Sequence, residues 1–312
     1  MKIACLQFVP VQGDIAGSIA KAEYLLRDLH PQDVNLLLLP ELAFAGYNFP
    51  SLEAIRPFLE PTHSGPSSTW ARNTAQRLGS FVSVGYAETT DFAFMKTLGN
   101  PAKDVDRQKN FNSNVTFGPD GNLVAHYRKH FLYMTDESWC VEGSERFFVG
   151  EYPAPINQRV AMGICMDINP YHFTAPWSSM EFANHACDVG AELVLLSMAW
   201  SSFDLSRENV FQEPEKLEPD WETVKYWFGR FQPLIQADHS VIIVMGNRSG
   251  VEKDVVYTGS SLIARIGRDT VEIWDIAGKG EERLIVVDTD TKPVFVWKAQ
   301  DIKPRVNEEV NV

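Results

Sequence analysis

The sequence contains few cysteines, and none lies in a pattern that would hold a metal ion or form a redox dithiol. The four are Cys5, Cys140, Cys165 and Cys187, with no Cys-x-x-Cys pair and no His/Cys cluster at zinc spacing. We therefore expect four free thiols, no metal and no cofactor. Reduced thiols are typical of intracellular proteins, so we expect a cytoplasmic location.

Long apolar runs and long basic runs are both missing. No apolar stretch approaches the roughly 18 residues of a membrane span, and the apparent first strand, 2–9, leaves no room for a signal peptide. The charge balance is acidic, with 28 Lys and Arg against 41 Asp and Glu, and the longest basic run is Arg128-Lys129-His130. We therefore expect neither a membrane nor a nucleic acid as a partner.

Segments rich in aliphatic and β-branched residues alternate with segments of helical periodicity. The expected strands are 2–9, 34–39, 81–86, 112–117, 123–126, 159–164, 193–198, 240–245, 260–264 and 284–287. The expected helices are 18–29, 68–78, 181–190 and 221–238. This alternation predicts an α/β protein built on sheets.

No linker or repeat divides the chain, so we expect a single domain, 1–312, with a C-terminal tail at 290–312. The polar, acidic stretch 201–220 is typical of a surface loop, either a functional lid or a tolerated insertion. The turn residues Gly118-Pro119-Asp120-Gly121 predict a β-hairpin that leads to Lys129.

Three polar residues stand at the edges of apolar strands: Glu41 after LLLLP, Lys129 within HYRKHFLY, and Cys165 after RVAMGI. A charge removed from water must be paired or neutralised, and open α/β sheets place ligands at the carboxyl ends of strands. Each residue also has an ordinary interpretation, as a salt-bridge partner, a surface lysine and a small core side chain respectively. Together they predict a hydrolytic site.

A carboxylate, an ammonium and a thiol meet the needs of amide cleavage. Cys165 would attack as a thiolate whose pKa is lowered by the charge of Lys129. Glu41, desolvated at its strand end, should have a raised pKa and would carry protons to the leaving ammonia and from water. The Lys129 ammonium and the backbone N–H of Met166 would bind the oxyanion.

A Cys/His site remains an alternative, because His126 and His130 flank Lys129. His126 alternates with Val124, so it also fits a strand face without any catalytic role.

The segments PELAFAGYNF, HYRKHFLY and GICMDINPY resemble the three catalytic motifs of the nitrilase, or carbon–nitrogen hydrolase, superfamily. More narrowly, the chain is similar to its fungal N-terminal amidase branch, whose members deamidate amino-terminal Asn and Gln. The resemblance implies a four-layer αββα sandwich and catalytic roles for Glu41, Lys129 and Cys165. It also implies a second glutamate, and Glu137, eight residues after Lys129, takes that position. It would orient Lys129 and the substrate amide, unless it is an exposed loop carboxylate.

Several residues near the motifs are candidates for substrate binding. Asn169, Pro170 and Tyr171 replace the Arg-Phe-Pro-Glu stretch of many generic nitrilases, which favours the N-terminal amidase branch. Asp167 either contacts substrate or, as its place after the nucleophile favours, binds backbone N–H groups. Trp139, Tyr171 and Trp200 either wall the pocket or belong to the core.

The resemblance implies an amidase that converts N-terminal Asn and Gln of proteins or peptides to Asp and Glu, releases ammonia, and feeds an N-end-rule (N-degron) pathway. A carboxylate or carbonyl must then face the α-ammonium of the substrate, and Asp167, Glu137 and the stretch 201–220 are candidates. A hydrolase of a free small amide, such as an ω-amidase or ureido-acid hydrolase, is one alternative. An inactive sandwich that serves as an interaction subunit is another. The chain could be a monomer or a homodimer.

Overall fold

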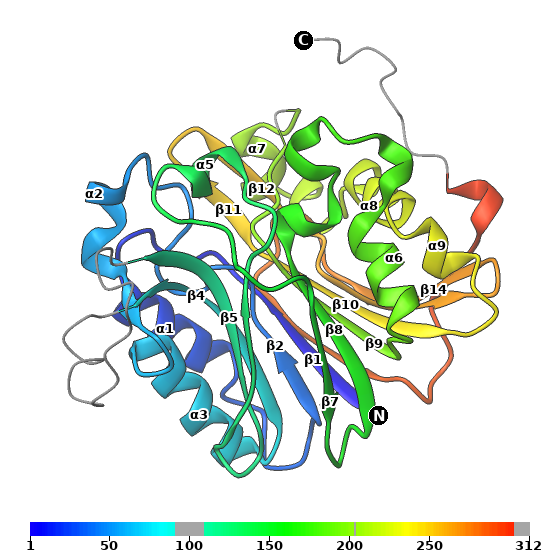
Figure 1. Cartoon of the computed structure of the whole chain (residues 1–312), viewed down its shortest axis with the longest axis horizontal. Coiled ribbons are helices and arrows are strands. Elements are labelled where there is room, and N and C mark those ends of the chain that lie inside the picture. The colour runs from blue at the N-terminus through cyan, green and yellow to red at the C-terminus, as the bar shows by residue number, and fades with distance from the viewer. Residues whose placement is uncertain (91–108, 203, 303–312) are drawn as a thin grey trace.

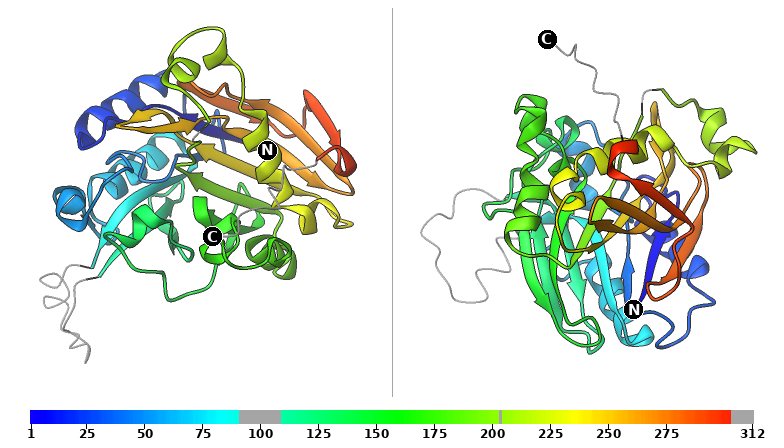
Figure 2. Two further views of the ribbon diagram at one scale, coloured as in Figure 1. Left: turned by 90° about the horizontal axis from the view of Figure 1, so that it is seen from above. Right: turned by 90° about the vertical axis from the view of Figure 1, so that its right-hand side faces the viewer.

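Two sheets of seven strands pack face to face, and helices cover the outer face of each (Figures 1 and 2). The computed structural model of the chain describes residues 1–90, 109–202 and 204–302. This arrangement confirms the α/β prediction and the αββα sandwich.

The first sheet has the strand order β15-β1-β2-β4-β5-β6, with β3 paired to β4. Its strands are β1 (Lys2–Gln7), β2 (Leu36–Leu38), β3 (Glu60–Pro61), β4 (Phe81–Thr89), β5 (Asn110–Phe117), β6 (Leu123–Arg128) and β15 (Arg283–Asp288). β1, β2 and β4 are parallel, and β6 runs in the same direction because both β4–β5 and β5–β6 pair antiparallel. The carboxyl ends of β2 and β6 therefore lie at one edge of the sheet.

The second sheet has the order β16-β14-β13-β10-β9-β8-β7, with β8, β9 and β10 parallel. Its strands are β7 (Phe148–Tyr152), β8 (Gln158–Ile164), β9 (Leu193–Met198), β10 (Val241–Asn247), β13 (Leu262–Gly267), β14 (Thr270–Ile276) and β16 (Phe295–Lys298). A separate ribbon pairs β11 (Ser249–Glu252) with β12 (Val255–Thr258).

Helices α1 (Ile15–Leu25) and α3 (Pro66–Leu78) lie on the first sheet, whereas α6 (Glu181–Asp188), α8 (Trp221–Gly229) and α9 (Gln232–Ile235) lie on the second (Figure 1). The short helices α2 (Leu52–Ile55), α5 (Met134–Glu137) and α7 (Arg207–Phe211) belong to connecting segments. Within the described ranges, no helix is both long enough and apolar enough to span a membrane.

The apolar run 36–39 shows why the two sheets pack as they do. Leu36 and Leu38 face the second sheet, whereas Leu37 and Leu39 pack under α1 and α3. Successive side chains of a strand point to opposite faces, so a strand covered on both sides reads as a continuous hydrophobic run. All four leucines are fully buried, which fixes the strand that leads to Glu41.

Several expected elements differ from the structure in extent. The expected helix 221–238 is two helices, because α8 ends at Gly229 and α9 begins at Gln232, just before Pro233. The stretch 201–220 contains α7 and a short 3₁₀ turn, Glu215–Leu217. Residues 290–302, expected as the start of a tail, include β16, which extends the second sheet, while the rest of that tail lies outside the described residues.

The hairpin and the thiol predictions are confirmed. The amide of Gly118 donates to the carbonyl of Asn122 at 2.9 Å, and Gly121 has a φ of +78°, which glycine adopts without strain. This turn connects β5 to β6. All four cysteines are free.

Candidate active site

Glu41, Lys129 and Cys165 follow the carboxyl ends of β2, β6 and β8, and the fold brings these three ends together. Glu41 and Lys129 are fully buried. The Nζ atom of Lys129 lies 2.7 Å from Oε1 of Glu41, so the two buried charges pair with each other. Burying either charge without the other would cost several kcal/mol, roughly 3–5 for a pair that loses one partner.

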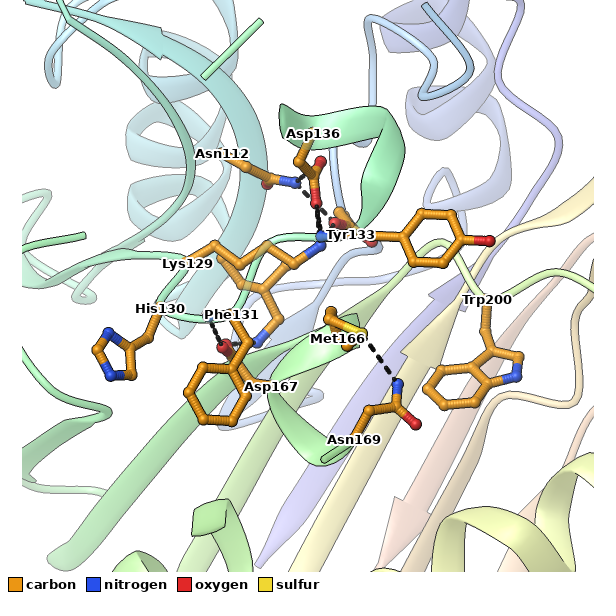
Figure 3. Close-up of polar contacts among 12 residues, drawn as sticks. Asn112, Lys129, His130, Phe131, Tyr133, Asp136, Met166, Asp167, Asn169 and Trp200 are labelled. Atoms are coloured by element: carbon orange, nitrogen blue, oxygen red, sulfur yellow. Dashed lines mark hydrogen bonds and ion pairs between the residues drawn. The ribbon is translucent and has the colours of Figure 1, made fainter. Parts of the chain in front are cut away.

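A second carboxylate, that of Asp136, completes the pairing of Lys129 (Figure 3). Its Oδ2 atom lies 2.6 Å from Lys129 Nζ, and it is also fully buried. The side-chain amide of Asn112 on β5 donates to Glu41 Oε1 at 2.7 Å and to Asp136 Oδ1 at 3.0 Å. One ammonium and one amide thus hold two carboxylates in a fixed arrangement.

The prediction that Glu137 orients Lys129 is wrong. Glu137 has a side chain that is 48% exposed, and its Oε1 lies 3.4 Å from Nδ1 of His172. Asp136 and Glu137 are neighbours in the four-residue helix α5, and successive helical residues point about 100° apart, so only one of them can face Lys129. The amide of Tyr133 also donates to Asp136 Oδ2 at 3.0 Å, which ties the start of α5 to the same carboxylate.

Cys165 begins the 3₁₀ turn Cys165–Ile168 directly after β8 and has a φ of +42°. A positive φ is uncommon for a residue with a side chain and marks a sharp turn. Cys165 is 9% exposed and reaches a cavity, whereas Glu41 Oε2 is buried and has no hydrogen-bond partner among the described residues. Glu41 therefore keeps one oxygen available for a proton.

The electrostatics correct the expected state of the thiol. Burial, and then the negative charge of Glu41, raise the pKa of Cys165 well above its ordinary value, although Lys129 acts in the opposite direction. Lys129 offsets only part of this rise, because Glu41 and Asp136 already pair with its ammonium. The expectation of a lowered thiol pKa is therefore wrong, and Cys165 needs a base to ionise it.

The pKa of Glu41 is raised by burial, an effect that Lys129 only partly offsets, and this confirms the sequence prediction. For Lys129, burial alone would lower the pKa, but the charges of Asp136 and Glu41 outweigh it and raise the pKa well above the usual value. Lys129 thus stays charged while Glu41 is poised to accept and return a proton.

A cavity of about 300 Å³ opens at the thiol. Its lining residues are Tyr47, Asn48, Tyr133, Met134, Thr135, Cys165, Met166, Asn169, Phe173, Ala199, Trp200, Ser201 and Val255. Met166, Asn169 and Trp200, all candidates from the sequence, are among them. A second cavity of about 620 Å³ adjoins it, since both are lined by Asn169, Phe173, Trp200 and Ser201.

Asp167 does not reach either cavity, so the prediction that it contacts substrate is wrong. Its buried carboxylate accepts a hydrogen bond from the amide of Phe131 at 2.8 Å (Figure 3). It also accepts from the amide of Ile164 at 2.7 Å and from the hydroxyl of Tyr127 at 2.8 Å. The alternative interpretation, binding of backbone N–H groups, is confirmed. Asp167 fixes the turn that carries Cys165 to the segment after Lys129.

Trp139 and Tyr171 also lie outside the cavity lining. Trp139 is buried in a cluster of apolar residues, which is the core interpretation. The hydroxyl of Tyr171 donates to Glu142 at 2.9 Å, and its ring packs on Phe131 with centroids 4.8 Å apart. Neither residue is placed to wall the pocket.

The Cys/His alternative finds no support in the geometry. His126 Nε2 lies 2.9 Å from the buried carboxylate of Glu88, which also pairs with Arg128. His130 stacks on Phe131 with ring centroids 5.2 Å apart. Neither imidazole lines the cavity at Cys165. Within the described ranges, no group of three or more His, Cys, Asp or Glu is placed to hold a metal ion.

Sequence reasoning missed Asp136, Asn112, Asn48 and Tyr133. Asp136 is an acid seven residues after Lys129 and could have been predicted, but the sequence does not distinguish it from the adjacent Glu137. Asn112 lies on an expected strand, where its side chain gave no sign of binding two carboxylates. Asn48 stands within the motif PELAFAGYNF, which could have suggested it.

The fold and the site agree with comparisons to known proteins. The family model for carbon–nitrogen hydrolases matches residues 2–170. The chain belongs to the carbon–nitrogen hydrolase family. It is 32% identical over 302 residues to the protein N-terminal amidase of Schizosaccharomyces pombe, across 92% of this chain and 98% of that protein.

Two solved structures have the same fold as this hydrolase. They are crystal structures of an N-terminal amidase, one with an Asn-Glu-Ala peptide and one with a Gln-Val peptide. Each superposes with a TM-score of 0.77 at 21% identity and covers 92% of this chain, with 97% and 96% of the respective structure covered.

Proposed function

We propose that this hydrolase removes the side-chain amide of amino-terminal Asn and Gln in peptides or proteins, giving Asp and Glu and releasing ammonia. The observation that carries the proposal is the position of Cys165 at the wall of a 300 Å³ cavity, close enough to the buried Glu41–Lys129 pair for both charges to shift its pKa. The similarity along almost the full length of an N-terminal amidase supports the substrate class.

In the first step, Glu41 takes the proton of the Cys165 thiol as Sγ attacks the amide carbon. The raised pKa values of both groups favour a proton transfer coupled to attack over a preformed thiolate. A C–S bond forms, and the electron pair of the C=O bond moves to oxygen.

The oxyanion is stabilised by Lys129 and by the backbone N–H of Met166. An ammonium has three donors, and Glu41 and Asp136 occupy two of those of Lys129, so one is left for the oxyanion. Glu41 then gives its proton to the amide nitrogen, the C–N bond breaks, and ammonia leaves a thioester on Cys165.

Water completes the reaction. Glu41 deprotonates a water molecule that attacks the thioester, and the same donors stabilise the second oxyanion. The C–S bond breaks, the thiolate regains a proton from Glu41, and the new carboxylic acid is released and gives its proton to solvent. Asn112 and Asp136 position Glu41 and Lys129 throughout.

We place this activity in the cytoplasm, where it would supply acidic amino termini to an N-degron pathway. Support for that role comes from the proposed chemistry, since Asp and Glu termini are its products. Every residue in the proposed reaction belongs to one chain, so the reaction is the same for a monomer and for a homodimer.

Ammonia release from two matched peptides tests the proposal. One is Asn-Gly-Ser-Lys with a free amino terminus, the other is the same peptide acetylated, and the Cys165→Ser variant serves as the blank. We expect turnover of the free peptide alone. Turnover of free small ω-amides or ureido acids with neither peptide cleaved would instead assign the site to a metabolite.

A further inference from the structure

The cavity at Cys165 is lined by neutral side chains, although the proposed substrate presents a charged α-ammonium. Among the described residues that line it, none is an Asp, Glu, Lys or Arg, whereas Asp204 and Asp220 of the stretch 201–220, and Glu222, line the adjoining cavity. Two asparagines, Asn48 after β2 and Asn169 after β8, are part of the lining. The side-chain amide of Asn48 is held through its nitrogen, and that of Asn169 through its oxygen.

Asn48 is held by its nitrogen atoms. Its Nδ2 donates to the backbone carbonyl of Glu252 at 3.2 Å, and its backbone N–H donates to Glu252 Oε2 at 2.7 Å. Glu252 is itself fixed, with Arg248 at 2.6 Å and the hydroxyl of Tyr257 at 2.8 Å. Asn48 Oδ1 has no partner among the described residues, so this wall of the cavity presents an acceptor.

Asn169 is held by its oxygen atom. The hydroxyl of Tyr226 on α8 donates to Asn169 Oδ1 at 2.6 Å, while Asn169 Nδ2 contacts the Met166 sulfur at 3.4 Å (Figure 3). A thioether is a weak acceptor, which favours the amide nitrogen on that side and satisfies little of its donor capacity. Asn169 therefore presents a donor, at a point shared by both cavities.

We propose that Asn48 and Asn169 together recognise the backbone of the first residue of the substrate. Asn48 Oδ1 accepts from the α-ammonium, and Asn169 Nδ2 donates to the backbone carbonyl of the same residue. The inference rests on the proposed function. It explains how a neutral cavity selects an amino terminus, because an internal Asn or Gln has no ammonium beside its backbone carbonyl.

Three small ligands separate the two contacts. Asn-Gly carries both the α-ammonium and the carbonyl. Succinamoylglycine keeps the amide and the carbonyl but has hydrogen in place of the ammonium. 3-Aminopropanamide keeps the amide and the ammonium but lacks the backbone carbonyl. Each is assayed as a substrate by ammonia release, and a ligand that is not turned over is assayed as a competitive inhibitor of Asn-Gly.

The Asn48 and Asn169 variants should each weaken a different pair of these three ligands. We expect Asn48→Leu to weaken kcat/KM or binding about 10- to 100-fold for Asn-Gly and 3-aminopropanamide, because each loses a hydrogen bond to a charged group, and to leave succinamoylglycine within about twofold. We expect Asn169→Leu to weaken Asn-Gly and succinamoylglycine about tenfold and to spare 3-aminopropanamide. Tyr226→Phe, which keeps the ring, should follow Asn169→Leu with a smaller effect.

Asn184→Leu is the matched control, because Asn184 is an exposed residue of α6 outside both cavities. Should Asn169→Leu fail to fold, Tyr226→Phe alone tests the donor contact. Equal losses on all three ligands, or no loss on Asn-Gly, would overturn the inference. Failure of the proposed function is a separate outcome, since wild-type enzyme would then release no ammonia from the side-chain amide of Asn-Gly or of the longer peptide.

Discussion

Asp136 Oδ2 lies 2.6 Å from Lys129 Nζ, and both groups are fully buried. With Glu41 at 2.7 Å, the ammonium has two acidic partners and one remaining donor. Lys129 is therefore held in place rather than left to activate Cys165 by its charge. We therefore expect the activity to depend on Asp136, although it is not one of the three residues that the sequence predicts to be catalytic.

Asp136→Asn tests this dependence against Glu137→Gln on the same helix. We expect Asp136→Asn to lower kcat about 10²- to 10³-fold, the range seen when one oxyanion donor is lost, because Lys129 would no longer be fixed. Glu137→Gln should keep kcat within about twofold. Steady-state ammonia release from Asn-Gly measures both, and a larger loss in Glu137→Gln would restore the original assignment.

The charge of Glu41 should control the ionisation of Cys165. Because Glu41 contributes to the raised pKa of the thiol, Glu41→Gln should lower that pKa while abolishing turnover. Thiolate absorbance near 240 nm, titrated against pH, measures it, with the matching Cys165→Ser protein subtracted to remove the other three thiols. An unchanged or higher pKa in Glu41→Gln would contradict the described electrostatics.

Glu60 provides a pH dependence of stability away from the site. Burial raises the pKa of Glu60 to about 7, despite hydrogen bonds from the amide and hydroxyl of Ser67. Between the ordinary value of 4.5 and about 7, the unfolded chain has lost this proton while the folded chain keeps it, so the free energy of unfolding falls as pH rises. The full effect is about 3 kcal/mol.

Glu60→Gln should remove that slope. Urea unfolding at pH 5 and pH 8 gives the free energy of unfolding of both proteins. We expect the wild type to lose more stability than the variant between these two pH values. Equal losses in the two proteins would show that Glu60 ionises normally in the folded state.

The sequence predicted most of the architecture because burial has a clear pattern. The run 36–39 required a strand covered on both faces, and the structure places its leucines alternately in the two cores. The predicted helix that begins at Trp221 is too long, because the helical spacing of apolar residues continues past Gly229 into α9. β16 was missed because its residues are mostly exposed and show no buried face.

The site was predictable where a costly polar residue interrupts an apolar strand, as at Glu41 and Cys165. It was not predictable where the choice depends on which face of a short helix points inward, as between Asp136 and Glu137. Contacts between residues far apart in the sequence could not be predicted from it either. Asn48 depends on Glu252, 204 residues away, and Asn169 depends on Tyr226, 57 residues away.

Asp167 shows how a motif residue can act through structure, and its substitution separates that role from substrate binding. Asp167→Asn replaces an acceptor oxygen with an amide that must face one of three donors, namely Ile164 N, Phe131 N or the hydroxyl of Tyr127. We expect the free energy of unfolding to fall by about 2–4 kcal/mol, because hydrogen bonds to a charged group contribute about 1.5–3 kcal/mol each. Tyr127→Phe removes one of these donors and also the acceptor of the His130 amide, so it should cost about 1.5–3 kcal/mol. Urea unfolding measures both, and a stable Asp167→Asn protein with a raised KM alone would return Asp167 to the substrate pocket.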